Sequence, residues 1–200
     1  DELDFIVIGD HTYAVDEDGV FTTSQLLEFD GKQYYFNENG EMAVKQIVPI
    51  DGASYYFGKY GTKQYNLLTK VGGNAYYFDE EGKMLCGQEL LLNNKEYYFD
   101  KEGVMAVKQR VKRAGNYYYY GKYGTKAKDK IVKVDDYKYY FDEDGIMVKD
   151  QMVTVGTKTY DFDKKGHMVF KQFVTDEEGN MYYFGKYGTM VKSKTAKVEG

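Results

Sequence analysis

A short aromatic pattern recurs along the whole chain and organises its apolar and polar positions. The triplet Tyr-Tyr-Phe, or a close variant, occurs nine times, and a glycine follows four residues after the end of each copy. The spacing between these glycines is 21 residues seven times and 22 residues once. Alternating aromatic residues are typical of a half-buried strand. We therefore expect nine copies of one β-hairpin unit, whose turn glycines are Gly19, Gly40, Gly61, Gly82, Gly103, Gly124, Gly145, Gly166 and Gly188.

The polar segment after each triplet predicts a tight turn. In residues 79–82, an aspartate at the first position can accept hydrogen bonds from the backbone of its own turn, and a glycine at the fourth position accepts a positive φ. We expect this D-x-x-G segment to close the hairpin, which pairs Phe78 with Met84 and Tyr76 with Cys86 on one face. The same register pairs Phe36 with Met42, Phe99 with Met105, Phe141 with Met147 and Phe162 with Met168.

Single hairpins of this length cannot stand alone. An isolated two-stranded hairpin is marginally stable in water, so the units must stack to bury their Phe and Met face. No composition shift or linker separates any two units. The sequence predicts an all-β solenoid of nine stacked hairpins that forms a single domain over residues 1–200.

A longer period overlies the first. Six turns are mainly acidic, whereas the turns at 58–61, 121–124 and 185–188 read GKYG. Two acidic turns precede each GKYG turn, which gives a period of 63 residues. If three hairpins complete one superhelical turn, equivalent units line up in columns, so we predict about three hairpins per turn.

The charge follows this longer period. The formal net charge is −5, yet residues 58–71, 121–134 and 185–198 hold twelve lysines and a single acid, Asp129. Two interpretations remain open: charged turns that keep strand edges soluble, or a Lys/Tyr stripe that binds an anionic polymer such as teichoic acid. The overall acidity argues against nucleic-acid binding. The stripe would consist of Lys59, Tyr60, Lys122, Tyr123, Lys186 and Tyr187.

Composition excludes several classes of protein. The chain has 23 Tyr and 12 Phe but no Trp, one Cys and two His. It lacks an apolar run of about 18 residues, so we expect no membrane insertion. One thiol cannot form an internal disulfide or a CxxC site, and Cys86 is expected to be a small core residue. His167 follows a turn glycine and is expected to be solvated.

Candidate chemistry is sparse. The aspartates of the turns at 16–19 and 142–145 could suggest Ca²⁺, but the calcium-binding loop with its distal glutamate is missing, and turn formation explains them. We therefore expect no metal, no cofactor and no enzymatic activity. No signal peptide is visible at the first residues, so we expect that it was removed or that the chain is a fragment.

The unit YYF-D-x-x-G-x-M resembles the cell-wall-binding repeats of Gram-positive bacteria, which include choline-binding and glucan-binding repeats and are related to the C-terminal repeats of clostridial toxins. The resemblance covers Tyr13 to about Lys197. It implies a superhelix of β-hairpins with about three units per turn, an extracellular location at the cell surface or in the secreted fraction, and binding to wall polymers or glycans. It also implies that such a region often anchors a separate functional domain.

One departure from the family pattern concerns the ligand. Such repeats commonly continue G-x-M-x-x-G-W, and their choline sites use the faces of Trp and Tyr around the quaternary ammonium. Here glutamine replaces this Trp in all six units with acidic turns, which argues against choline as the ligand. The replacing residues are Gln25, Gln46, Gln88, Gln109, Gln151 and Gln172.

The residues that remain favour a glycan ligand. A tyrosine ring offers an apolar face to a sugar, and a glutamine amide can donate to and accept from sugar hydroxyls. The alternative is that these rings only pack hairpin on hairpin. The candidate glycan-binding residues are Tyr35, Tyr56, Tyr77, Tyr98 and Tyr140 with Gln46, Gln88, Gln109 and Gln151.

The function we predict is a non-catalytic module that binds cell-wall or surface glycan through repeated weak sites, which gain strength by avidity. Its partner would be teichoic acid, a peptidoglycan-linked polymer or a glucan-type chain. The alternative is a structural or adhesive spacer, or a repeat region that binds a host protein.

Overall fold

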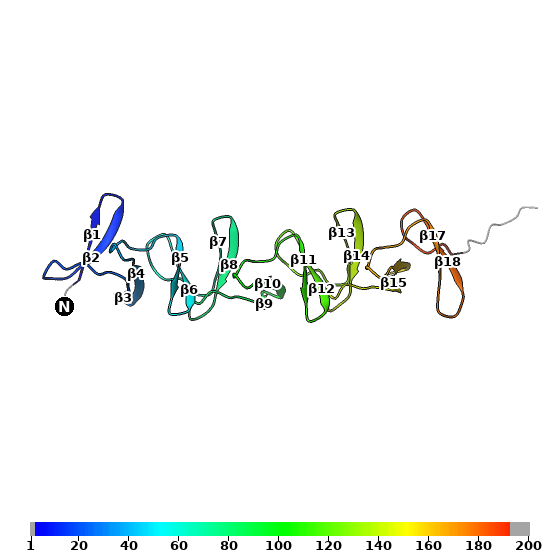
Figure 1. Cartoon of the computed structure of the whole chain (residues 1–200), viewed down its shortest axis with the longest axis horizontal. Helices are drawn as coiled ribbons and strands as arrows, with labels where there is room; N and C mark the ends of the chain where they lie inside the picture. The colour runs from blue at the N-terminus through cyan, green and yellow to red at the C-terminus, as the bar shows by residue number, and fades with distance from the viewer. Residues whose placement is uncertain (1–2, 193–200) are drawn as a thin grey trace, which may run out of the picture. The chain divides into compact units, whose positions relative to one another are not determined.

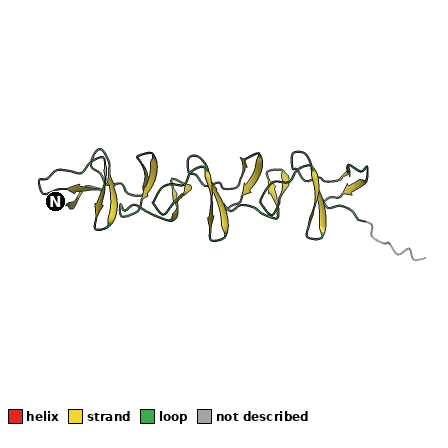
Figure 2. Ribbon diagram, turned by 90° about the horizontal axis from the view of Figure 1, so that it is seen from below, coloured by secondary structure: helices red, strands yellow, loops and turns green. Residues whose placement is uncertain are grey.

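A computed structural model describes residues 3–192, which contain eighteen β-strands and no helix (Figures 1 and 2). Each strand pairs with its neighbour in sequence to form a two-stranded antiparallel sheet, which gives nine hairpins. Over these residues the chain has no helix that is long and apolar enough to cross a membrane. The predicted all-β fold of nine hairpins is confirmed.

The strands of the first five hairpins are β1 (Asp4–Ile8) and β2 (His11–Val15), β3 (Gln25–Phe29) and β4 (Lys32–Phe36), β5 (Gln46–Ile50) and β6 (Ala53–Phe57), β7 (Leu67–Val71) and β8 (Asn74–Phe78), and β9 (Gln88–Leu92) and β10 (Lys95–Phe99). The other four are β11 (Gln109–Arg113) and β12 (Asn116–Tyr120), β13 (Lys130–Val134) and β14 (Tyr137–Phe141), β15 (Gln151–Val155) and β16 (Lys158–Phe162), and β17 (Gln172–Thr175) and β18 (Met181–Phe184).

The turn that closes each hairpin lies before the aromatic strand, so the prediction that the D-x-x-G segment after the triplet closes it is wrong. In the third hairpin, Asp51 and Gly52 connect β5 to β6 with φ of 49° and 79°. Two successive positive φ angles define the mirror-image turn that suits the twist of a two-residue hairpin. The register then places Gln46 opposite Phe57 and the next residue, 47, opposite 56.

The D-x-x-G segment instead leads away from the hairpin. The predicted Phe–Met pairs do form, but each is a single bridge, as between Phe78 and Met84. One residue later, the backbone N–H of Leu85 donates to the carbonyl of Tyr77 at 2.9 Å. The chain then departs, so Cys86 is exposed rather than a core residue paired with Tyr76.

The local chemistry of the D-x-x-G turn is as predicted. The carboxylate of Asp79 accepts the backbone N–H groups of Glu81 at 2.9 Å and of Lys83 at 2.8 Å. Gly82 has a φ of 76°, and a Cβ on it would lie 2.9 Å from the carbonyl oxygen of Gln64. The turn therefore needs both residues, one for its hydrogen bonds and one for its backbone conformation.

Successive hairpins are joined by backbone hydrogen bonds that span 30 residues. The N–H of Met84 donates to the carbonyl of Ser54 at 2.8 Å, and the N–H of Met147 donates to the carbonyl of Tyr117 at the same distance. The last residue of each aromatic strand from the second to the ninth hairpin forms the core. These fully buried side chains are Phe36, Phe57, Phe78, Phe99, Tyr120, Phe141, Phe162 and Phe184.

The chain forms two compact units, and the division between them runs through the hairpin of β9 and β10. The first comprises residues 1–90 and 98–105, and the second comprises residues 91–97 and 106–200. Each unit is a stack of successive hairpins. Within the first, β1–β2 and β7–β8 project to the same side in Figure 1 with two hairpins between them, in keeping with the predicted three hairpins per turn. One continuous domain over residues 1–200 stays a prediction.

Candidate binding pockets between successive hairpins

In five of the aromatic strands, the central tyrosine packs on the core phenylalanine of the following hairpin. The Tyr56 ring stacks on Phe78 with centroids 5.6 Å apart, and the Tyr119 ring lies 5.9 Å from Phe141. The alternative interpretation of the tyrosine ladder, packing of hairpin on hairpin, is therefore present in the structure. The same contact joins Tyr35 to Phe57, Tyr77 to Phe99 and Tyr140 to Phe162. Tyr98 is half-buried.

Hollows lie beside this ladder at equivalent positions of the repeat. The Tyr35 pocket, of about 410 Å³, is lined by Ser24, Gln25, Leu26, Tyr35, Pro49, Ile50 and Asp51. The Asp161 pocket, of about 400 Å³, is lined by the residues 126 positions further along, namely Asp150, Gln151, Met152, Asp161, Thr175, Asp176 and Glu177, and also by Phe162, Asp163 and Val174. The same pocket thus recurs six repeat units apart.

A second pair of pockets is related in the same way. The Tyr77 pocket, of about 430 Å³ in the first unit, is lined by Asn66, Tyr77, Asp79, Glu80, Glu81, Lys83, Leu85 and Leu90. The Tyr119 pocket, of about 550 Å³ in the second unit, is lined 42 positions further along by Tyr119, Gly121, Lys122, Tyr123, Thr125, Ala127 and Val132. It is extended by Asn94, Lys95, Glu96, Lys126, Lys128 and Lys130.

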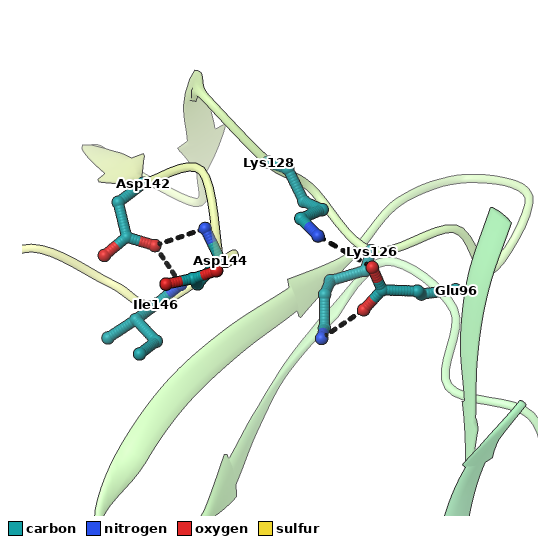
Figure 3. A network of polar contacts seen from close by, with 6 residues as sticks. All are labelled: Glu96, Lys126, Lys128, Asp142, Asp144 and Ile146. Carbon is teal, nitrogen blue, oxygen red and sulfur yellow. Dashed lines mark hydrogen bonds and ion pairs between the residues drawn. The ribbon is translucent and has the colours of Figure 1, made fainter. Parts of the chain in front are cut away.

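A three-residue ion cluster forms one wall of the Tyr119 pocket (Figure 3). The carboxylate of Glu96 lies 2.5 Å from the ammonium of Lys126 and 2.7 Å from that of Lys128. The backbone N–H of Lys126 also donates to the Glu96 carbonyl at 2.8 Å, so the same bond that joins successive hairpins sets this ion pair. The side chain of Lys126 is 6% exposed.

The two acids near this pocket have fixed partners. Hydrogen bonds from Lys126 and Lys128 hold the pKa of the Glu96 carboxyl below its usual range, so Glu96 is ionised at neutral pH. The Asp129 carboxylate accepts the hydroxyl of Tyr140 at 2.7 Å. Burial and this hydrogen bond to a carboxylate raise the pKa of Tyr140 to about 12.

The Asp161 pocket has the opposite charge. Asp161 stands where other units carry the central tyrosine, and its side chain is buried. Burial raises the pKa of the Asp161 carboxyl above its usual range, and the charges of Asp150 and Asp163 raise it further. A charged group at this position is costly because water is excluded from it.

The structure brings only some of the predicted glycan-binding residues together. Tyr35 shares a pocket with Gln25, and Gln151 lies in the Asp161 pocket. The predicted glutamines are all exposed at the start of the first strand of their hairpins. Tyr56, Tyr98, Tyr140, Gln46, Gln88 and Gln109 line none of these four pockets.

The predicted Lys/Tyr stripe consists of exposed pairs. Tyr60, Tyr123 and Tyr187 are 74%, 73% and 71% exposed. In each pair the preceding lysine places its ammonium 5.2–5.5 Å from the tyrosine ring centroid. The alignment of the pairs into one stripe stays a prediction, and residues 193–198 of the third lysine-rich segment lie outside the described residues.

Two further expectations about single residues can be compared with the structure. His167 is not solvated: its ring stacks on Tyr137 with centroids 3.8 Å apart and meets Tyr139 edge-on. The aspartates considered for Ca²⁺ serve their turns, since the Asp142 carboxylate accepts the N–H groups of Asp144 and Ile146 (Figure 3). Within residues 3–192, no group of three or more His, Cys, Asp or Glu is placed to hold a metal ion.

Sequence reasoning missed Glu96 and Lys95 as site residues. They belong to strand β10, and Glu96 lies about 30 residues before the lysines that it pairs with, so the backbone bond between hairpins is needed to bring them together. A signal for the contact between Glu96 and Lys126 was present in the sequence repeat. Lys126 occupies the position that holds a methionine in most of the other units, and residue 96 lies at the fixed 30-residue offset from it.

Two family models match this chain. The model of the choline-binding repeat matches residues 67–109 and 128–173, and the model of the cell wall binding repeat matches residues 26–42. Together they cover more than half of the chain. The match to a choline-binding repeat does not support the prediction that argued against choline. No curated protein sequence matches the chain.

Several solved structures from Streptococcus pneumoniae share the fold. The modular autolysin LytC is 25% identical with a TM-score of 0.71, over 94% of this chain and 41% of that one. The choline-binding domain of CbpL is 23% identical with a TM-score of 0.66, over 96% and 98%. Choline binding protein F, solved in the presence of a peptidoglycan analogue, is 24% identical with a TM-score of 0.66, over 90% and 61%. This chain thus spans about two fifths of the LytC chain.

Proposed function

Because this chain belongs to the family of choline-binding, cell-wall-binding repeats, we propose that it is a non-catalytic module that attaches its protein to the Gram-positive cell wall. Its ligand is a wall polymer, either a teichoic acid, a peptidoglycan-linked glycan or a glucan-type chain. The module acts at the cell surface or after secretion. It requires no cofactor and does not insert into a membrane.

The observation that carries this proposal is that two kinds of pocket between successive hairpins each recur at equivalent positions of the repeat. The Tyr35 and Asp161 pockets use equivalent positions, and so do the Tyr77 and Tyr119 pockets. Each has a volume of about 400–550 Å³, which accommodates one or two sugar or polyol units. Equivalent sites along a repeat suit a polymer, because each added contact is intramolecular and raises the total affinity by avidity.

Choline is the second candidate ligand, since the matching family model is that of a choline-binding repeat. A choline cage needs several aromatic faces around the ammonium group. The Tyr77 and Tyr35 pockets each offer one aromatic ring, the Tyr119 pocket offers two together with five lysines that repel a cation, and the chain has no tryptophan. We therefore place choline after the wall polymer, and direct titration with choline chloride decides between them.

The test is sedimentation of the full chain with purified Gram-positive walls, compared with the same walls after chemical removal of teichoic acid. Binding to intact walls supports the proposal, and its loss after extraction identifies teichoic acid as the ligand. Displacement by free choline at millimolar concentration would assign choline instead. If the chain stays in solution with both preparations, the proposal is contradicted and the spacer or host-protein role is favoured.

A further inference from the structure

The Tyr77 and Tyr119 pockets have the same position in the repeat and opposite charge. Three carboxylates and one lysine line the Tyr77 pocket, a formal charge of −2. Five lysines and one glutamate line the Tyr119 pocket, a formal charge of +4. Part of the reversal lies in the turn itself, where Asp79 and Glu80 are replaced by Gly121 and Lys122. The GKYG turn therefore converts an acidic pocket into a basic one.

Most of this positive charge is not neutralised inside the protein. Glu96 pairs with Lys126 and Lys128. Among the described residues, no carboxylate forms an ion pair with Lys95, Lys122 or Lys130. The nearby acid Asp129 has its carboxylate engaged with the Tyr140 hydroxyl rather than with a lysine of the pocket. The pocket thus presents ammonium groups that an anion can neutralise.

Glu96 positions two lysines of this site and does not cancel the positive charge of the pocket. Its carboxylate holds two ammonium groups within 2.7 Å, and it fixes Lys126, whose side chain is almost fully buried against the ring of Tyr118 at 5.0 Å. A cation that is held in place before the ligand arrives loses less conformational entropy on binding. The other lysines that line the pocket are exposed to solvent.

The non-charged lining favours a phosphorylated polyol or sugar over a bare ion. Tyr119 and Val132 give an apolar wall, and the exposed ring of Tyr123 lies at the pocket with Lys122 over it at 5.2 Å. Thr125 and Asn94 add hydrogen-bonding groups. Aromatic faces suit sugar or polyol carbons, and lysine ammonium groups are common partners of phosphate oxygens.

We propose that the Tyr119 pocket binds a phosphate group of a phosphodiester-linked polyol or sugar polymer, and that the Tyr77 pocket does not. This inference rests on the proposed wall-binding function and names the part of the polymer that one pocket recognises. A phosphodiester is ionised at all physiological pH values, so its binding depends on salt rather than on pH over that range.

Isothermal titration calorimetry of the full chain with an oligomer of glycerol phosphate tests this inference, with glycerol as the neutral probe. Lys122→Glu places at this turn the charge that Glu80 carries in the Tyr77 pocket. It should weaken binding by at least about fivefold, the loss of one charge-assisted contact at a partly exposed site. Lys122→Arg should retain binding. Lys101→Glu is the matched control, since Lys101 occupies the same turn position in the preceding unit and lines none of the pockets described here.

The outcomes separate this inference from the proposed function. Weaker binding of glycerol phosphate by Lys122→Glu, together with unchanged binding by Lys101→Glu, supports a phosphate site in the Tyr119 pocket. Equal losses in both variants would show a general charge effect and overturn it. Wall binding that survives Lys122→Glu, with no binding of glycerol phosphate by the wild type, would overturn the inference and leave the proposed function standing. Binding of a single-stranded oligonucleotide in place of glycerol phosphate would reassign the pocket to nucleic acid and overturn it as well.

Discussion

The Tyr77 pocket of the first unit and the Tyr119 pocket of the second are copies of one structural element with different chemistry. In both, the central tyrosine packs on the core phenylalanine of the next hairpin. The ring centroids are 6.3 Å apart for Tyr77 and Phe99, and 5.9 Å apart for Tyr119 and Phe141. Their charges are opposite in part because the turns that border them differ and in part because four further lysines line the Tyr119 pocket. The comparison teaches that two pockets beside the same kind of buried contact can differ in charge, because the exposed residues that line them differ.

The largest effect should come from the part that the two pockets share. Phe141→Ala and Phe99→Ala each remove a fully buried ring, and each should lower the free energy of unfolding by about 3–5 kcal/mol. Urea unfolding monitored by circular dichroism measures this loss. Because the two rings occupy equivalent positions in the core, the two losses of unfolding free energy should agree closely. A much smaller loss for one of them would show that the pockets are not equivalent.

A smaller effect should follow when the acidic turn is restored in the basic pocket. Gly121 does not require a positive φ, and the nearest atom to a Cβ there is the Thr125 carbonyl oxygen at 3.7 Å. Gly121→Asp should therefore recover the side-chain bonds that Asp79 makes and raise the free energy of unfolding by about 0.5–1 kcal/mol.

The same variant should weaken glycerol phosphate binding, because it adds a carboxylate to the lining of the Tyr119 pocket. Stability by urea unfolding and affinity by calorimetry should thus move in opposite directions. Asp79→Gly is the reciprocal change in the first unit, and it should reduce stability without creating a phosphate site. If Gly121→Asp gained stability and kept full affinity, the turn would not control the pocket.

The ion cluster of the Tyr119 pocket predicts a modest dependence of stability on pH. The pKa of Glu96 is lowered in the folded state, so its contribution is present above the unfolded value of about 4.3 and is lost as pH falls through the folded value. The contribution should be less than about 1 kcal/mol, because the site is partly exposed to solvent. Wild type and Glu96→Gln should differ in melting temperature at pH 7 and converge as the pH falls below the pKa of Glu96 in the folded protein. A constant difference across that range would exclude the ion pair as its cause.

The smallest effect concerns the hydrogen bond that the Tyr140 hydroxyl donates to Asp129 beside the Tyr119 pocket. The pKa of Tyr140 is about 12 in the folded protein, above the usual value of about 10. Its contribution to stability is therefore present below about pH 10 and is lost as pH rises toward 12. Absorbance of tyrosinate should show a late-titrating residue that disappears in Tyr140→Phe. Asp129→Asn should lower the midpoint, since it removes the carboxylate that accepts the hydroxyl.

The sequence predicted the repeat, the left-handed glycines and the Phe–Met bridges, because each depends on residues within one unit. The hairpin turn was misplaced because the D-x-x-G segment and the segment before the aromatic strand both contain turn residues. The pairs Asp30-Gly31 and Asp51-Gly52 are strong two-residue hairpin signals and could have identified the true turn.

The candidate site was predicted only in part. Lys122 and Tyr123 were identified, because the GKYG motif is visible in the sequence. The partnership of Glu96 with Lys126 and Lys128 was not, since it depends on contacts between successive hairpins. The exposure of the ladder tyrosines could not be deduced from the sequence either. These tyrosines alternate with the core residues as predicted, but their rings pack largely on the next hairpin.

The most direct test of the central claim is a titration of the unmutated chain, labelled with ¹⁵N, with the glycerol phosphate oligomer, followed by nuclear magnetic resonance. We predict saturable shifts of the amide signals of Gly121 and Thr125 in the Tyr119 pocket, while those of Asp79 and Lys83 in the Tyr77 pocket stay in place. Equal shifts at both pockets, or shifts at the Tyr77 pocket alone, would contradict the claim that the turn sequence sets the chemistry of a recurrent pocket.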